Sequence, residues 1–118
     1  MAAGDTRELI ERAVRRFQEE VPALERLKLV ATLELRGRGD TQIYRVEVPG
    51  PKVSKETMGD ERIEVSVSRS HFNELAKDGR LRHWKEAFDN GHVRVTGDSA
   101  VVKLVGNVIE RQLARSRA

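Results

Sequence analysis

The stretch WKEAFDNGHVRVTGD, residues 84–98, carries the local signals that decide the fold. Its first part has the apolar spacing of a helix, with the residues Trp84, Ala87 and Phe88. Gly91 follows and can adopt the left-handed backbone conformation that ends a helix. This half of the stretch therefore predicts a short helix that ends at a glycine.

The second half of the stretch changes period. Val93 and Val95 alternate with polar neighbours, which is the two-residue period of a strand. Gly97 allows a tight reversal, and Asp98 can accept hydrogen bonds from the free amides that begin another helix. The pattern continues into an apolar spacing typical of a final amphipathic helix, with Val101, Leu104, Val105, Val108 and Ile109.

Working outward toward the N-terminus, the sequence predicts a long helix, four strands and a first short helix. The long helix is expected over Asp5–Glu20, where apolar residues recur at three- and four-residue spacing: Leu9, Ile10, Ala13, Val14 and Phe17, with Val21 directly after its end. The strands are expected over residues 28–36, 43–48, 52–57 and 62–67, the third being weak and at an edge. Ser68 or Ser70 caps the first short helix, which Gly79 closes.

The predicted strands each have one apolar and one polar face. This is typical of a mostly antiparallel sheet that helices cover on one side. We therefore expect an α+β fold, a five-stranded mostly antiparallel sheet with an N-terminal and a C-terminal helix. The helices should pack on the face that carries Leu33, Val46, Val65 and Val95.

Length and composition limit the classes of protein to which this chain can belong. With 118 residues and a mass of 13.4 kDa, the chain fits one domain over residues 1–118. The count of Cys 0 excludes thiolate nucleophiles and cysteine-ligated metals. No signal peptide and no apolar run of about 18 residues is visible. We expect a cytoplasmic protein, without stable membrane insertion, that is a monomer or weak dimer.

The polar residues do not form a recognisable catalytic or metal site. No two of the three histidines, His71, His83 and His92, have metal-ligand spacing. The sequence also lacks a nucleophile elbow, a Walker loop and a dinucleotide fingerprint. We expect no enzymatic activity, no cofactor and no metal. Arginines and glutamates alternate on the outer sheet face without exposed aromatics, which disfavours nucleic-acid binding.

The helix-glycine-strand-glycine-Asp-helix pattern of residues 84–98, together with the order of elements, resembles the sterol carrier protein type 2 family. The resemblance spans nearly the whole chain, although its specific part is confined to that stretch. It implies a five-stranded sheet with helices on one side and an apolar tunnel between them. The implied function is non-catalytic binding of a fatty acyl chain, sterol or isoprenoid lipid, as a carrier or an accessory module.

The resemblance also implies which residues would line the tunnel. The candidates are Leu35, Val46, Trp84, Phe88, Val101, Leu104, Val105 and Val108. Trp84, with an apolar body and one N–H donor, suits the mouth. Each candidate can equally be ordinary core, because short aliphatics can also pack to normal density. The alternative hypothesis is a protein-interaction domain with a filled core that docks a partner enzyme.

Overall fold

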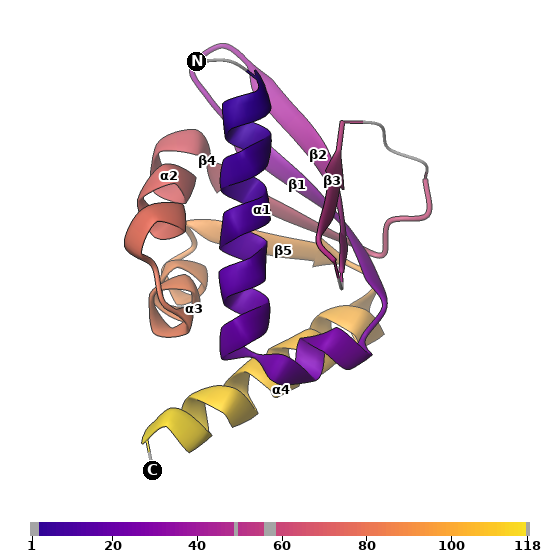
Figure 1. The fold of residues 1–118 in the computed structure, drawn as a ribbon, viewed down its shortest axis with the longest axis vertical. Coiled ribbons are helices and arrows are strands. Elements are labelled where there is room, and N and C mark those ends of the chain that lie inside the picture. The colour runs from indigo at the N-terminus through magenta and orange to yellow at the C-terminus, as the bar shows by residue number, and fades with distance from the viewer. Residues whose placement is uncertain (1–2, 49, 56–58, 118) are drawn as a thin grey trace.

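The computed structural model describes residues 3–48, 50–55 and 59–117, and its elements follow the predicted order (Figure 1). The helices are α1 (Ala3–Glu20), the short 3-10 helix η1 (Pro22–Arg26), α2 (Arg69–Asp78), α3 (Leu81–Asp89) and α4 (Ser99–Arg117). The strands are β1 (Leu29–Arg36), β2 (Thr41–Val48), β3 (Lys52–Ser54), β4 (Ile63–Ser68) and β5 (Val93–Gly97).

The five strands form one sheet in the order β3-β2-β1-β4-β5. Three neighbouring pairs are antiparallel, and the central pair β1–β4 is parallel. The registers place Leu33 beside Tyr44 on one side and beside Val65 on the other. The predicted mostly antiparallel sheet is confirmed, with the parallel pair at its centre.

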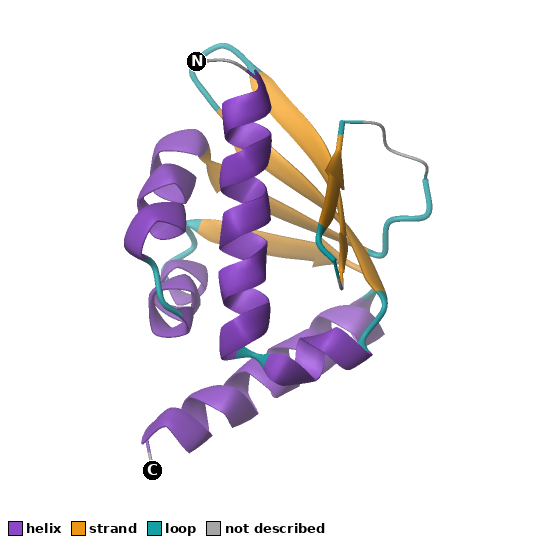
Figure 2. Ribbon diagram, in the orientation of Figure 1, coloured by secondary structure: helices purple, strands orange, loops and turns teal. Residues whose placement is uncertain are grey.

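The helices lie on one side of the sheet, as Figure 2 shows. The helix α1 crosses in front of the strands, α2 and α3 lie beside it, and α4 runs across the end where α1 stops (Figure 1). The α1 helix contacts α2, β3 and η1, whereas α4 contacts β5, α3 and η1. The α4 helix therefore closes one end of the space between sheet and helices.

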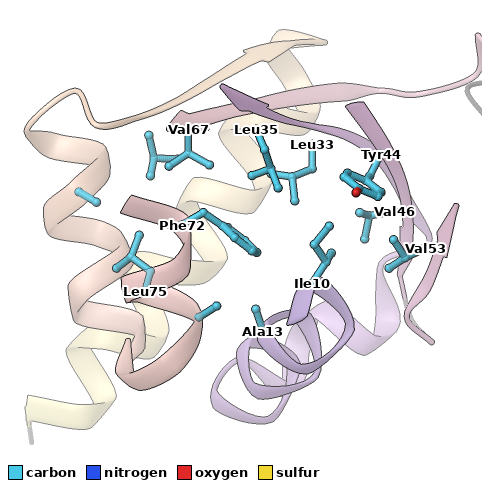
Figure 3. Close-up of a cluster of buried hydrophobic side chains, with 13 residues drawn as sticks. Ile10, Ala13, Leu33, Leu35, Tyr44, Val46, Val53, Val67, Phe72 and Leu75 are labelled. Atoms are coloured by element: carbon cyan, nitrogen blue, oxygen red, sulfur yellow. The ribbon is translucent and has the colours of Figure 1, made fainter. Parts of the chain in front are cut away.

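The buried core fills only part of that space. Its main cluster joins Ile10 of α1 and Phe72 of α2 to the inner sheet residues Leu35, Tyr44 and Val67 (Figure 3). A second, smaller cluster forms where α1 ends, from Val21, Leu24, Leu81 and Leu113. This second cluster joins η1, α3 and α4 where α1 ends.

The signals in residues 84–98 act as predicted. Gly91 has a φ of +80° at the end of α3. Gly97 has a φ of +123°, and a Cβ there would lie 2.5 Å from the backbone oxygen of Arg62. The Oδ1 atom of Asp98 accepts hydrogen bonds from the amides of Ala100 and Val101, at 3.0 and 3.3 Å. The α4 helix is thus capped where the sequence indicated.

Some helix and strand boundaries in the structure differ from those that the sequence predicts. The first helix begins at Ala3 instead of Asp5. The strand expected over residues 52–57 is paired only at Lys52–Ser54, and Glu56 and Thr57 lie outside the described residues. Gly79 ends α2 in an extended conformation with a φ of −68°. Glycine is needed there because a Cβ would lie 2.3 Å from the Leu75 carbonyl oxygen.

The outer sheet face is not uniformly open to solvent. Arg45, one of the arginines of this outer face, is only 6% exposed. Its Nη2 atom lies 2.9 Å from Asp60 Oδ2, Nη1 lies 2.9 Å from Glu47 Oε1, and Nε lies 3.2 Å from Glu61 Oε2. Three carboxylates thus surround one guanidinium and hold residues 60–61, which precede β4, against β2.

Candidate ligand cavity

The inner sheet face is incompletely covered at its centre. Ala31 of the central strand β1 and Val65 of its neighbour β4 point toward the helices, yet both are only half-buried. Val95 of β5 and Val48 of β2 are half-buried as well. Apolar side chains in the middle of a helix-covered sheet are normally packed to high density. Their exposure therefore indicates a space between the sheet and the helices.

That space is a cavity of about 520 Å³, within the roughly 300–1,000 Å³ typical of small-molecule sites. Its sheet floor includes Leu29, Ala31, Leu33, Val46, Val48, Ile63, Val65, Val93 and Val95. Its helical walls include Ala13, Val14, Phe17, Gln18, Trp84, Lys85, Phe88, Val102, Val105, Ile109 and Glu110. The lining is predominantly aliphatic and aromatic, so it suits a hydrocarbon.

Three aromatic rings form one side of the cavity. Trp84 of α3 meets Phe17 of α1 edge-on, with ring centroids 6.2 Å apart and an interplanar angle of 87°. It meets Phe72 of α2 at 6.0 Å and 66°. Edge-to-face packing of this kind is favourable and fixes ring orientation. Trp84, which we expect at the mouth of the cavity, is half-buried and packs against aromatic rings of two other helices, and its place at the mouth stays a prediction.

The rim of the cavity is formed by α3 and α4. Phe88 lines the cavity and is 46% exposed, which places it where the cavity meets solvent. The Nζ atom of the neighbouring Lys85 lies 2.7 Å from Asp89 Oδ1 and 3.1 Å from Glu110 Oε1. Hydrogen bonds to these carboxylates, first Asp89 and then Glu110, raise the pKa of Lys85. The lysine thereby links α3 to α4 as a cation.

One polar side chain lies inside the apolar wall. Gln18 of α1 lines the cavity and is only 7% exposed. Its Oε1 atom is buried and accepts no hydrogen bond within the described chain. Buried polar atoms in proteins nearly always have a partner. Gln18 is therefore a buried residue of the lining whose side-chain oxygen lacks a hydrogen-bond donor.

Four of the eight residues predicted to line a tunnel do line the cavity. They are Val46 on the sheet floor, Trp84 and Phe88 on α3, and Val105 on α4. They come from three separate elements, which the fold brings to one space. Their contact with a ligand stays a prediction.

The other four predicted residues lie elsewhere. Leu35 is fully buried in the main core, because the cavity lies over the opposite end of β1. Val108 packs against the second cluster. Leu104 is 47% exposed, and Val101 lies in the first turn of α4 outside the lining. The α4 helix instead presents Val102, Val105 and Ile109 to the cavity.

Sequence reasoning missed Gln18, Ala31 and Lys85. Gln18 gave a visible signal, because it lies one turn after Val14 in the predicted α1 stripe and is polar. Ala31 also gave one, as the smallest residue on the inner face of β1. The sequence did not indicate that Lys85 would reach Glu110, since that pairing depends on how α4 crosses α3.

Several solved structures have a similar arrangement of elements. The sterol carrier protein domain 2 of Helicoverpa armigera matches with a TM-score of 0.61 and 10% identity, over 89% of this chain and 84% of that chain. The palmitated SCP2L2 of Aedes aegypti matches with a TM-score of 0.59 and 16% identity, over 85% and 93%. Sterol carrier protein 2 of Yarrowia lipolytica matches with a TM-score of 0.53 and 19% identity, over 77% of this chain and 78% of that chain.

The chain has the sterol carrier protein type 2 fold. At these low identities the likeness shows the fold alone. No protein-family model and no curated protein matches the sequence. The resemblance seen in residues 84–98 is therefore confirmed at the level of architecture.

The described parts of the chain contain neither a membrane-crossing helix nor a metal-binding cluster. No described helix is both long and apolar enough to span a bilayer. Among the same residues, no group of three or more His, Cys, Asp or Glu side chains is placed to hold a metal ion.

Proposed function

We propose that this protein binds an apolar ligand without catalysis, in the cavity between sheet and helices. The ligand would be a fatty acyl chain, a sterol or an isoprenoid lipid, held as a carrier or an accessory module would hold it. One observation carries the proposal: the apolar side chains at the centre of the covered sheet face, such as Ala31 and Val65, are half-buried over a 520 Å³ cavity.

The driving force would be removal of hydrocarbon from water. Burying one methylene group is worth about 0.8 kcal/mol. Each two-carbon extension of a chain that still fits should therefore tighten binding roughly tenfold. Val46, Trp84, Phe88 and Val105 are the predicted residues that we propose contact the ligand, because all four line the cavity.

The comparisons support this ligand class. The Aedes aegypti relative is described as palmitated, and it shares the fold over most of both chains. A chain with the same layers can place a hydrocarbon in the same space. The low identity means that the ligand itself must be tested here.

The test is native mass spectrometry of the purified protein, followed by lipid extraction and titration with a fluorescent long-chain fatty acid. The matched variants are Ala31→Phe, which adds a ring on the cavity side of β1, and Val30→Phe, which adds a ring on the outer side. We expect Ala31→Phe to abolish binding and Val30→Phe to retain it.

The opposite result would exclude the proposal. If the wild-type protein carries no lipid and takes up no fatty acid, long-chain alcohol, sterol or isoprenoid, ligand binding is wrong. The alternative, a domain that docks a partner enzyme, would then take its place. If Ala31→Phe and the wild type bind equally well, the ligand lies outside this cavity.

A further inference from the structure

Gln18 is the buried polar residue of the described lining, whereas the other polar lining residues, such as Lys85, Asn107 and Glu110, are half-buried or exposed. It lies one turn after Val14, which also lines the cavity. Its Oε1 atom accepts no hydrogen bond within the described chain. An unpaired acceptor in a low-dielectric site is unfavourable, and a donor supplied by a ligand would relieve that cost.

The position of Gln18 on α1 shows which side of the cavity it faces. Arg16 Nη1 donates a 3.0 Å hydrogen bond to the carbonyl of Lys77 in α2, and Glu20 Oε2 accepts a 2.8 Å hydrogen bond from the amide of Leu81 in α3. Gln18 is two residues from each, so it points roughly 160° away from both. It therefore faces away from α2 and from α3, the helix that carries Lys85.

The charges of the lining make this part of the cavity suitable for a neutral group. The cationic lining residues are Lys85 of α3 and Lys103 of α4. Lys85 already pairs with Asp89 and Glu110. Lys103 is exposed, so the described lining offers no buried, unpaired cation to a carboxylate placed beside the buried Gln18, and burying that charge alone would be costly. A hydroxyl group is neutral and carries the donor that the Oε1 acceptor lacks.

We propose that Gln18 is the head-group site of the cavity and that it accepts a hydrogen bond from the hydroxyl of a long-chain neutral lipid. The hydrocarbon of that lipid would lie over Ala31 and Val65 on the sheet floor. This inference rests on the proposed function, since it presumes a ligand in the cavity. It adds the chemical class of the head group and the residue that selects it.

The experiment compares hexadecanol with its methyl ether, which has the same chain but no hydrogen-bond donor. Each is used to displace diphenylhexatriene, a fluorescent hydrocarbon probe, from the protein. We expect the wild type to bind the alcohol roughly five- to tenfold more tightly than the ether. Gln18→Leu should bind both equally, with its affinity for the ether unchanged.

Asn107→Leu is the matched control, because Asn107 is another amide residue of the lining but lies on α4. It should keep the preference for the alcohol. Thermal unfolding gives a second readout that needs no ligand. Gln18→Leu should unfold at a higher temperature than the wild type, because the substitution removes an unpaired buried acceptor.

The outcomes separate this inference from the proposed function. Binding of the probe with equal affinity for alcohol and ether in the wild type would overturn the role of Gln18 and leave ligand binding standing. A lower unfolding temperature for Gln18→Leu would also overturn it, since the amide would then be satisfied in the folded protein. Failure of the wild type to bind the probe, the alcohol and the ether would overturn both.

Discussion

Lys85 on α3 pairs with Glu110 on α4, with 3.1 Å between Nζ and Oε1, and both residues line the cavity. This contact joins the two helices that form the rim. Lys85 also pairs with Asp89 of its own helix at 2.7 Å, and this contact holds the ammonium group in the position from which it pairs with α4. The pair is therefore placed to slow the separation of α4 from α3.

The first prediction is that Glu110→Gln speeds ligand release. Removing the carboxylate should raise the dissociation rate of bound diphenylhexatriene roughly two- to fivefold, as expected for a partly exposed ion pair. Stopped-flow transfer to acceptor vesicles measures this rate. Glu86→Gln, at an exposed position of α3, is the control and should leave the rate unchanged. High salt should reduce the difference between Glu110→Gln and the wild type.

The second prediction contrasts two glycines. Gly97→Ala should destabilise the protein by more than about 2 kcal/mol, because its φ is +123° and the new Cβ would lie 2.8 Å from the Ile63 Cα atom. Gly106→Ala, in α4, should stabilise it by about 0.5–1 kcal/mol, since nothing lies within 4 Å of its Cβ position. Urea unfolding measures both. Equal effects would contradict the close approach at Gly97.

The third prediction concerns the start of α4. Asp98→Ala should cost about 1 kcal/mol, because Oδ1 accepts from the amides of Ala100 and Val101. Asp98→Asn keeps an acceptor and should restore most of the loss. This second variant does not keep the 3.3 Å ion pair with Arg62. A large loss of stability in Asp98→Asn would therefore mean that the exposed pair, not the cap, is the main contribution.

The arrangement of helices and strands could be predicted from the sequence, because each local signal indicates one type of structure. Gly97 and Asp98 separate a segment with the two-residue period of a strand from a segment with the period of a helix. Together they specify a strand, a turn and a capped helix. Alternation along β1 and β4 likewise identifies the inner face. These features depend on neighbours in the chain, so they need no knowledge of the packing between elements.

The cavity lining was predicted only in part, because it depends on how helices rotate and where they cross. The α4 helix is apolar on several sides, so the spacing that gives Val101, Leu104 and Val108 is as regular as the one that gives Val102 and Ile109. The structure places the second set on the cavity. Alternation along β1 could not indicate that Leu35 is packed while Ala31 is left half-buried.

The last prediction concerns the pH dependence of folding stability through Asp60. A hydrogen bond from Arg45 holds the pKa of the Asp60 carboxyl below its ordinary value of 3.8, although burial opposes this shift. The ionised carboxylate thus stabilises the folded state above that value, and the contribution is lost as pH falls through the lower folded pKa.

Asp60→Asn should therefore be less stable than the wild type at about pH 7, and the difference should shrink as the solution is acidified below about pH 4. Urea unfolding across this range measures it. Glu64→Gln, an exposed residue of the outer sheet face, is the control and should show no such convergence. Because Glu47 and Glu61 still pair with Arg45, the protein should stay folded in Asp60→Asn. A constant difference at every pH would mean that Asp60 contributes through packing and not through its charge.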